Sequence, residues 1–152
     1  MSAGNTAETD ILKLIFNNTT WTGLGDATGA VGSTVAGSLY VALHTADPGE
    51  TGSQTTSEAN YTSYDRVAVA RSTAGWTVSG TAPTQAANAA AITFPACTGG
   101  SSTCTYFSVG RVSYSSAGEI LFSGALSSPS SLAVTNGITP SFAIGALTVT
   151  LD

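Results

Sequence analysis

The sequence predicts a mainly β protein, a single β-sandwich or jelly-roll-like domain with a short N-terminal helix. From residue 39 onward, about eight short apolar stretches of strand length are separated by Gly, Pro, Asn and Ser turn signals. The final stretch alternates Leu147, Val149 and Leu151 with threonines, as a half-buried strand does. Only residues 5–16 have a helical period. Periodicity does not distinguish a sandwich from a jelly roll.

The predicted helix begins at Asn5, a good N-cap residue, and Glu8 follows three residues later as in a capping box. Its apolar face is formed by Ile11, Leu14 and Ile15, widened by Leu12 and Phe16. We expect this face to pack internally, because apolar helix faces usually do. Docking on a partner protein is the alternative, which makes Ile11, Leu14 and Ile15 candidate partner contacts.

Residues 22–37 are rich in Gly, Ala, Ser and Thr and have neither a helical nor a strand period. A structureless stretch of this length is unusual inside a compact domain and indicates a functional excursion, here one that reaches a neighbouring subunit. The sequence therefore divides into an arm of helix and Gly-rich loop at 1–37 and a β-sandwich body at 38–152.

Turn chemistry separates the strands of the body. Asp47-Pro48-Gly49 follows the first strand, and Asn136-Gly137 is the strongest hairpin signal of the chain. The predicted strands are 39–44, 65–72, 75–79, 89–94, 105–114, 119–126, 132–135, 138–142 and a last one around Val149. The Asn-Gly turn predicts that 132–135 and 138–142 form a hairpin.

Charge is scarce in this chain. Charged residues make up 9% of it, with four Lys or Arg against nine Asp or Glu and a net charge of -5. Nucleic-acid binding is not expected, because no basic surface is available for a phosphate backbone. Free β proteins protect their strand edges with charge, so the shortage predicts that neighbouring proteins cover much of the surface. A secreted protein with a hydroxyl-rich surface is the alternative.

No apolar run approaches the length of about 20 residues that a membrane helix needs. The N-terminus has no basic start and no apolar stretch, so we expect no signal peptide and synthesis in a cytoplasm.

The sequence does not predict an enzyme, a metal site or a cofactor. His44 is the only histidine, and no Gly-x-Ser-x-Gly motif lies in a strand–turn–helix setting. His44 is more readily interpreted as a residue at the end of a strand than as part of a Ser-His-Asp catalytic site. A calcium site near Asp47 and Glu50 is not expected, because this acid-poor stretch offers too few oxygen ligands.

Cys97 and Cys104 flank the flexible sequence Thr-Gly-Gly-Ser-Ser-Thr. A disulfide across this loop and two free thiols are both open, because the geometry of the sulfurs decides between them. A cytoplasm would keep the thiols reduced until release.

Two further groups have alternative interpretations. Arg66 and Arg71 are candidate contacts to acids of an adjacent copy, or they form weak surface bridges to Asp65 or Glu58 of the same chain. Aromatic residues offer a sugar-binding platform, although such residues more often fill a core. These residues are Tyr40, Tyr61, Tyr64 and Trp76.

Several sequence blocks follow one another in an order that carries a family resemblance. They are Leu-Tyr-Val-Ala-Leu (39–43), Tyr-Asp-Arg-Val (64–67), Ile-Thr-Phe-Pro-Ala (92–96), Phe-Ser-Val-Gly (107–110), Gly-Glu-Ile-Leu-Phe-Ser-Gly-Ala-Leu (118–126) and the closing Gly-Ala-Leu-Thr-Val-Thr-Leu-Asp (145–152). In these blocks the chain resembles a family of small tailed-bacteriophage virion proteins, labelled tail-fibre-like proteins or capsid decoration (cement) proteins. The long 22–37 loop and the two cysteines depart from the family pattern.

The resemblance implies a structural protein of the virion with no catalytic residues. The function expected first is that of a capsid decoration protein, which binds the major capsid protein of the head, bridges its subunits and self-associates as a dimer or trimer. The alternative is a tail-fibre or tail-tip module that binds host glycan, with Trp76, Tyr61 and Tyr64 exposed. A hydrolase using His44 is a third hypothesis.

Overall fold

The structure is a computed structural model, described for residues 3–25, 28–80 and 83–151, and the chain is mainly β, as the sequence predicts. The strand pairs β1–β7, β7–β8, β3–β4, β4–β11 and β6–β9 are antiparallel, consistent with a β-sandwich. The chain divides into two compact units, which we describe separately. Unit 1 comprises Met1–Ser38, Ala70–Ile92 and Phe142–Asp152, and unit 2 comprises Leu39–Val69 and Thr93–Ser141. The division at residue 37 into arm and body stays a prediction.

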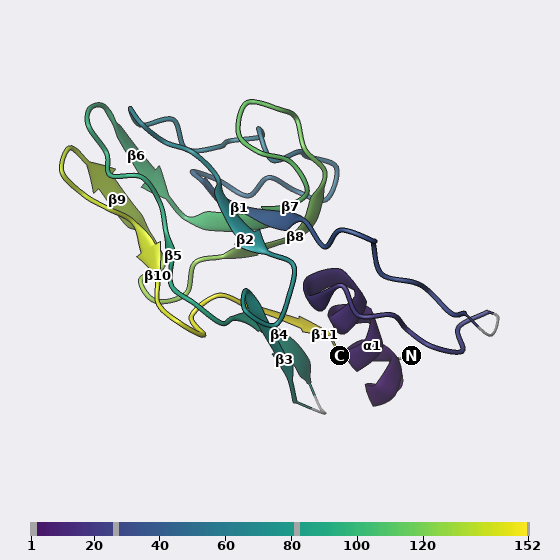
Figure 1. Cartoon of the computed structure of the whole chain (residues 1–152). Helices are drawn as coiled ribbons and strands as arrows, with labels where there is room; N and C mark the ends of the chain where they lie inside the picture. The colour runs from purple at the N-terminus through teal and green to yellow at the C-terminus, as the bar shows by residue number, and fades with distance from the viewer. Residues whose placement is uncertain (1–2, 26–27, 81–82, 152) are drawn as a thin grey trace. The chain divides into compact units, whose positions relative to one another are not determined.

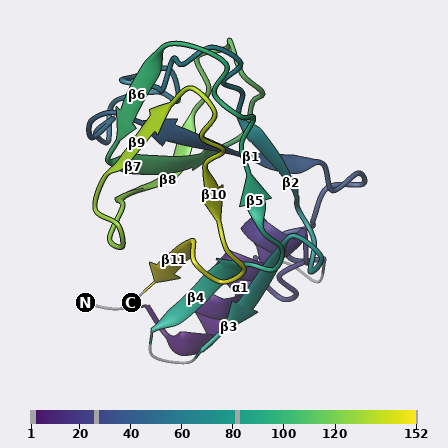
Figure 2. The same cartoon turned by 90° about the vertical axis from the view of Figure 1, so that its left-hand side faces the viewer.

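Unit 1 consists of the helix α1 (Asn5–Asn17) and a three-stranded sheet (Figures 1 and 2). The sheet has the order β11 (Thr148–Leu151), β4 (Thr84–Asn88), β3 (Trp76–Ser79). Leu12 and Phe16 of α1 are fully buried, and the Phe16 ring lies edge-on to Trp76 with 4.8 Å between ring centroids. The helix therefore packs within its own unit.

Unit 2 is built around a four-stranded sheet of order β2 (Val67–Ala70), β1 (Ser38–His44), β7 (Tyr106–Gly110), β8 (Ile120–Ala125). A second, two-stranded sheet pairs β6 (Ser101–Cys104) with β9 (Leu132–Thr135). The short strands β5 (Ile92–Thr93) and β10 (Ser141–Phe142) form a further two-stranded sheet. In the core, Val41 lies opposite Val109, and both are fully buried.

The structure differs from the prediction in two additional strands and in one strand pairing. The strands β4 and β6 were not predicted, because small and hydroxyl side chains hide their alternating burial. The Asn136-Gly137 turn forms, with Ile138 N–H donating to Thr135 O at 2.9 Å and Gly137 at φ 86°. The strands that it joins do not form a hairpin, since β9 pairs with β6 and β10 pairs with β5.

The predicted capping box is wrong. Gly4, not Asn5, is the N-cap of α1, and it makes no side-chain cap hydrogen bond at the start of the helix. Glu8 is buried and accepts a hydrogen bond from Thr84 Oγ1 at 3.2 Å, so its carboxylate is used in packing α1 on β4. No helix in the described part of the chain is long and apolar enough to cross a membrane.

Candidate assembly surface

In its described residues, the segment that follows α1 has no helix or strand, as the sequence predicts for 22–37, but backbone hydrogen bonds join its two sides. Trp21 and Ala30 form an antiparallel bridge, with N–H···O distances of 2.9 and 3.0 Å in the two directions. Gly32 N–H also donates to Thr20 Oγ1 at 3.3 Å. We call residues 18–25 and 28–35 the finger, which continues from the end of α1 in Figure 1.

Asn18 and Arg71 hold the base of the finger. Asn18 Nδ2 donates to Ser33 O at 2.8 Å, and Ser33 N–H donates to Asn18 Oδ1 at 2.7 Å. Arg71 donates from Nε to Ile15 O at 2.6 Å and from Nη2 to Leu14 O at 2.7 Å. Its Nη1 donates to Ser33 Oγ at 3.1 Å. Because helix C-termini carry partial negative charge, this cation stabilises the end of α1 while it binds the finger.

Two glycines permit the close approach of the two sides of the finger. A Cβ at Gly29 would overlap Trp21 O, and one at Gly32 would overlap Asn18 O. Gly29 also has a φ of 69°, in the left-handed region that favours glycine. The glycines that deprive this segment of a helical or strand period in the sequence therefore also allow the finger to form.

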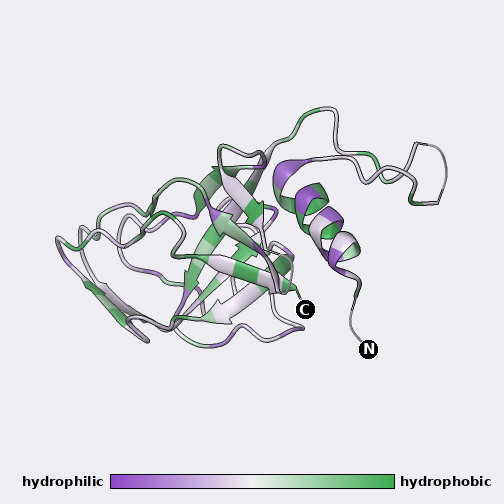
Figure 3. Cartoon of the chain, turned by 90° about the horizontal axis from the view of Figure 1, so that it is seen from below, coloured by the Kyte–Doolittle hydropathy of each residue, from purple (hydrophilic) through white to green (hydrophobic). Residues whose placement is uncertain are grey.

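Large apolar side chains on the finger are exposed. Leu24, Val31 and Val35 have exposed fractions of 47%, 65% and 79%. Figure 3 shows green, hydrophobic positions along this segment with few purple, hydrophilic ones. Exposed apolar side chains can form a surface that another protein covers. The finger is therefore our candidate assembly surface.

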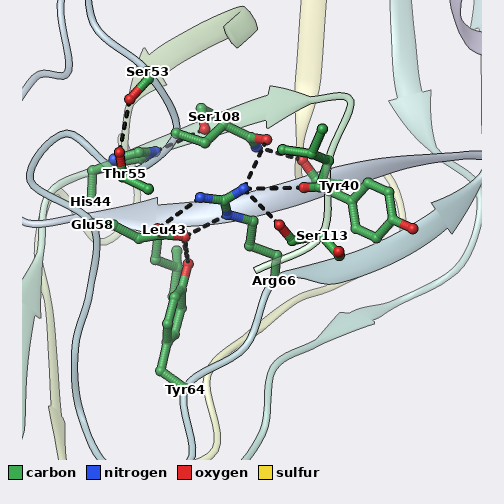
Figure 4. A network of polar contacts seen from close by, with 12 residues as sticks. Tyr40, Leu43, His44, Ser53, Thr55, Glu58, Tyr64, Arg66, Ser108 and Ser113 are labelled. Carbon is green, nitrogen blue, oxygen red and sulfur yellow. Dashed lines mark hydrogen bonds and ion pairs between the residues drawn. The ribbon is translucent and has the colours of Figure 1, made fainter. Parts of the chain in front are cut away.

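A network of polar side chains around Arg66 and Glu58 is buried in unit 2 (Figure 4). Arg66 and Glu58 form a two-pronged ion pair, with Nε–Oε1 at 2.7 Å and Nη2–Oε2 at 2.9 Å. The side chain of Arg66 is 0% exposed and that of Glu58 is 7% exposed. Arg66 Nη1 also donates to Ser113 O at 3.0 Å, and Tyr64 OH donates to Glu58 Oε1 at 3.1 Å. Arg66 therefore ties three separate segments of unit 2 together.

Arg66 thus pairs within the chain, with Glu58, as one of the two interpretations states. The pair is not a weak surface bridge, because both side chains are buried. Among the described residues no acid pairs with Arg71, and its hydrogen bonds go to the end of α1 and to the finger. A partner contact through either arginine stays a prediction, as it does for Ile11, Leu14 and Ile15, which are partly buried.

His44 is fully buried and hydrogen-bonded at both ring nitrogens. Nδ1 lies 2.8 Å from Thr56 O, and Nε2 lies 2.8 Å from Ser108 Oγ. The carbonyl requires Nδ1 to carry the proton, so Nε2 accepts from the Ser108 hydroxyl. Burial lowers the pKa of His44 below its usual 6.5, although the Thr56 carbonyl and the Glu58 carboxylate oppose this shift. Ser108 is also fully buried, so this contact joins strands and does not face a substrate.

The remaining candidates from the sequence are also accounted for by packing. The aromatic platform is wrong as an exposed site, because Trp76, Tyr61 and Tyr64 are 0%, 2% and 5% exposed. Burial raises the pKa of Tyr61 to about 12. Cys97 and Cys104 are free, buried thiols in this structure, and burial raises the pKa of Cys104 to about 11. Within the described residues, no cluster of three or more His, Cys, Asp or Glu is placed to hold a metal ion.

Sequence reasoning missed Gln54 and the hydrogen bonds of Asn18 to Ser33. Asn18 has a φ of 56° as the C-cap of α1, and an Asn at a predicted helix end is the signal that identifies this conformation. Gln54 is fully buried and donates from Nε2 to Tyr40 O at 3.0 Å, and no local pattern marks it.

Comparison with known families gives one match that spans almost the whole chain. The family model described as podophage GP4 fiber I protein gp80 matches residues 2–150. No curated protein matches the chain.

Proposed function

The chain belongs to the family of the podophage GP4 fiber I protein gp80 and is therefore a structural protein of a phage virion, and from this premise we propose that it is a fibre subunit that binds a neighbouring virion protein through its finger. The observation that carries the proposal is the exposure of Leu24, Val31 and Val35 on a segment held by specific hydrogen bonds.

The finger is suited to this role because hydrogen bonds within the chain already hold its two sides together before a partner binds. The Trp21–Ala30 bridge and the Asn18–Ser33 contacts fix its backbone within the free chain. A preorganised segment loses less conformational entropy on binding, so more of the contact energy appears as affinity. Because charge is scarce in the chain, apolar and hydroxyl contacts would hold the partner.

Catalysis is not part of the proposal. His44 and Ser108 are both fully buried, so this pair does not lie at a surface where substrate would bind. Host-glycan binding through Trp76, Tyr61 and Tyr64 is not part of it either, because these rings lie in the cores of their units.

Capsid decoration is the second candidate function. Its support is the charge-poor composition, with only 9% charged residues, which suits a protein whose surface is covered in the assembled head. In that case the finger would bridge subunits of the major capsid protein, and binding only to the assembled shell would stabilise the shell by mass action.

Co-sedimentation of the purified protein with separated phage heads and tails tests both candidates. Saturable binding to tails alone supports the fibre subunit, and saturable binding to heads with a fixed copy number supports the decoration protein. The double variant Val31→Ser/Val35→Ser should weaken binding at least about tenfold, since it removes two apolar contacts. Ile138→Ser, which changes an exposed apolar residue (42%) outside the finger, is the matched control. Equal binding by wild type and the double variant would overturn the role of the finger.

A further inference from the structure

The free edge of β8 is the longest exposed strand edge of the two larger sheets. β8 ends the four-stranded sheet of unit 2 and has six residues, whereas the edge strands β2, β3 and β11 have four each. No Asp, Glu, Lys or Arg occurs in β8, or anywhere from residue 120 to residue 151. Proteins that stay monomeric protect such an edge with charge, proline or a covering segment.

The register identifies which peptide groups point away from the sheet. Leu126 N–H donates to Thr105 O at 2.8 Å, on the side of β7. Since backbone direction alternates along a strand, Gly124 and Phe122 also bond toward β7, and Ser123 and Ala125 point outward. Within the described residues, no backbone hydrogen bond reaches the outward groups of Ser123 and Ala125. Ser53 bridges Glu119, just before β8 begins, and leaves this part of the edge uncovered.

We propose that β8 pairs with β8 of a second copy of this chain, antiparallel across a two-fold axis, with Ser123 opposite Ala125 of the partner subunit. In this register each Ser123–Ala125 pair exchanges two N–H···O bonds, so all the outward groups of the two residues are satisfied. Gly124 lies opposite its own copy on the axis.

A second copy fits this edge because the edge is complementary to itself. On one face the small, exposed side chains of Ser123 and Ala125 oppose each other. On the other face, the partly exposed Phe122 lies opposite Leu126 of the partner subunit. These apolar pairs flank the two glycines and lose their remaining solvent exposure, which favours association.

The charge distribution also favours self-pairing. A two-fold axis at Gly124 brings the residues beside it near their own copies, so a charge at position 123 or 125 would lie close to a like charge. The nearest charge is Glu119, which pairs with Arg111 at 2.7 Å. The axis places the two Glu119 residues at opposite ends of the paired strands, where they do not repel each other. This inference goes beyond the proposed function, because it concerns a contact between copies and not attachment to the virion.

Sedimentation equilibrium of the purified full chain tests the pairing. Wild type should have twice the monomer mass, and Ser123→Lys should raise the dimer dissociation constant at least about tenfold through like-charge repulsion. Thr103→Lys, at an exposed position of β6, is the matched control and should leave the dimer unchanged. A monomeric wild type, or a dimer indifferent to Ser123→Lys, would overturn the proposal without affecting the binding to heads or tails.

Cysteine pairing tests the register. Opposite residues of a hydrogen-bonded pair have Cα atoms about 5.5 Å apart, which suits a disulfide. A mixture of Ser123→Cys and Ala125→Cys chains should therefore cross-link under oxidation far faster than either variant alone. The native thiols are buried and should not compete. Equal cross-linking in all three samples would refute the register. Should Ser123→Lys fail to fold, concentration-dependent exchange of the Ser123 and Ala125 amides in wild type decides the question, and exchange independent of concentration refutes the pairing.

Discussion

The carboxamide of Asn18 binds both backbone groups of Ser33, with Nδ2 donating to the carbonyl and Oδ1 accepting from the N–H. Asn18 is also the C-cap of α1, with φ 56° and ψ 27°. One residue therefore ends the helix and fixes the base of the finger, so the direction of the finger is coupled to the end of α1.

Substitution of Asn18 separates these two roles. Asn18→Gly keeps the left-handed backbone at little cost, whereas Asn18→Ala adds strain of about 1 kcal/mol. Both variants lose the contacts with Ser33. We expect hydrogen exchange at the Ser33 and Ala30 amides to accelerate in both, and the free energy of unfolding to fall further in Asn18→Ala. Unchanged exchange in both variants would mean that the Trp21–Ala30 bridge alone orders the finger.

The glycines of the finger provide a second comparison. Gly23 and Gly29 both have positive φ, 79° and 69°, but a Cβ at Gly23 meets open space and one at Gly29 overlaps Trp21 O. Gly23→Ala should cost only the backbone strain, about 1 kcal/mol. Gly29→Ala should in addition break the Trp21–Ala30 bridge and increase proteolysis within the finger. Equal proteolysis of the two variants would contradict the close pairing.

Two Arg–Glu pairs of equal length test the effect of burial. Arg66–Glu58 and Arg111–Glu119 both have their closest N–O distance at 2.7 Å, but only the first pair is buried. Arg66→Met leaves Glu58 charged and unpaired in the interior and should cost about 3–5 kcal/mol of unfolding free energy. Arg111→Met should cost less than about 1 kcal/mol, because water solvates the remaining carboxylate. Denaturant unfolding measures both, and similar losses would show that burial does not decide the cost.

The sequence predicts those parts of this fold that depend on local pattern. The helix, the strand at residues 39–44 and the final strand around Val149 are predicted because their apolar periods are clear. The family resemblance is confirmed by the match over residues 2–150. The resemblance did not distinguish fibre from decoration protein, because ordinary β sequence carries it.

Long-range pairing explains the failures. Nothing local in the Asn136-Gly137 turn indicates that β9 pairs with β6, which lies about thirty residues earlier in the chain. The glycines of the finger are evident in the sequence, but their function depends on the carbonyls of Trp21 and Asn18, which only the folded chain brings close. Similarly, the sequence left open whether Arg66 contacts an adjacent copy or forms a weak surface bridge within the chain, because burial of its partner Glu58 is a tertiary property.

The buried His44 makes the stability of the protein depend on pH. Its pKa in the folded chain is lower than 6.5, so above pH 6.5 the ring is neutral in both the folded and the unfolded states. As the pH falls below 6.5, the unfolded chain takes up a proton that the folded chain resists, and the free energy of unfolding decreases by up to about 1.4 kcal/mol per pH unit. The loss ends at the folded-state pKa, below which both states are protonated.

His44→Gln removes this titration while it keeps a polar side chain near Thr56 and Ser108. We expect the variant to be less stable than wild type at pH 8, because two hydrogen bonds are altered, and to lose less stability between pH 6.5 and pH 5. Denaturant unfolding of both proteins across this range gives the slope of unfolding free energy against pH for each. The contribution of the carboxylates, which both proteins share, cancels in the difference between the two slopes. Ser108→Ala is the control, since it removes one hydrogen bond but keeps the imidazole, and its slope should remain that of wild type. Parallel curves for wild type and His44→Gln would show that His44 does not govern the acid sensitivity of the fold.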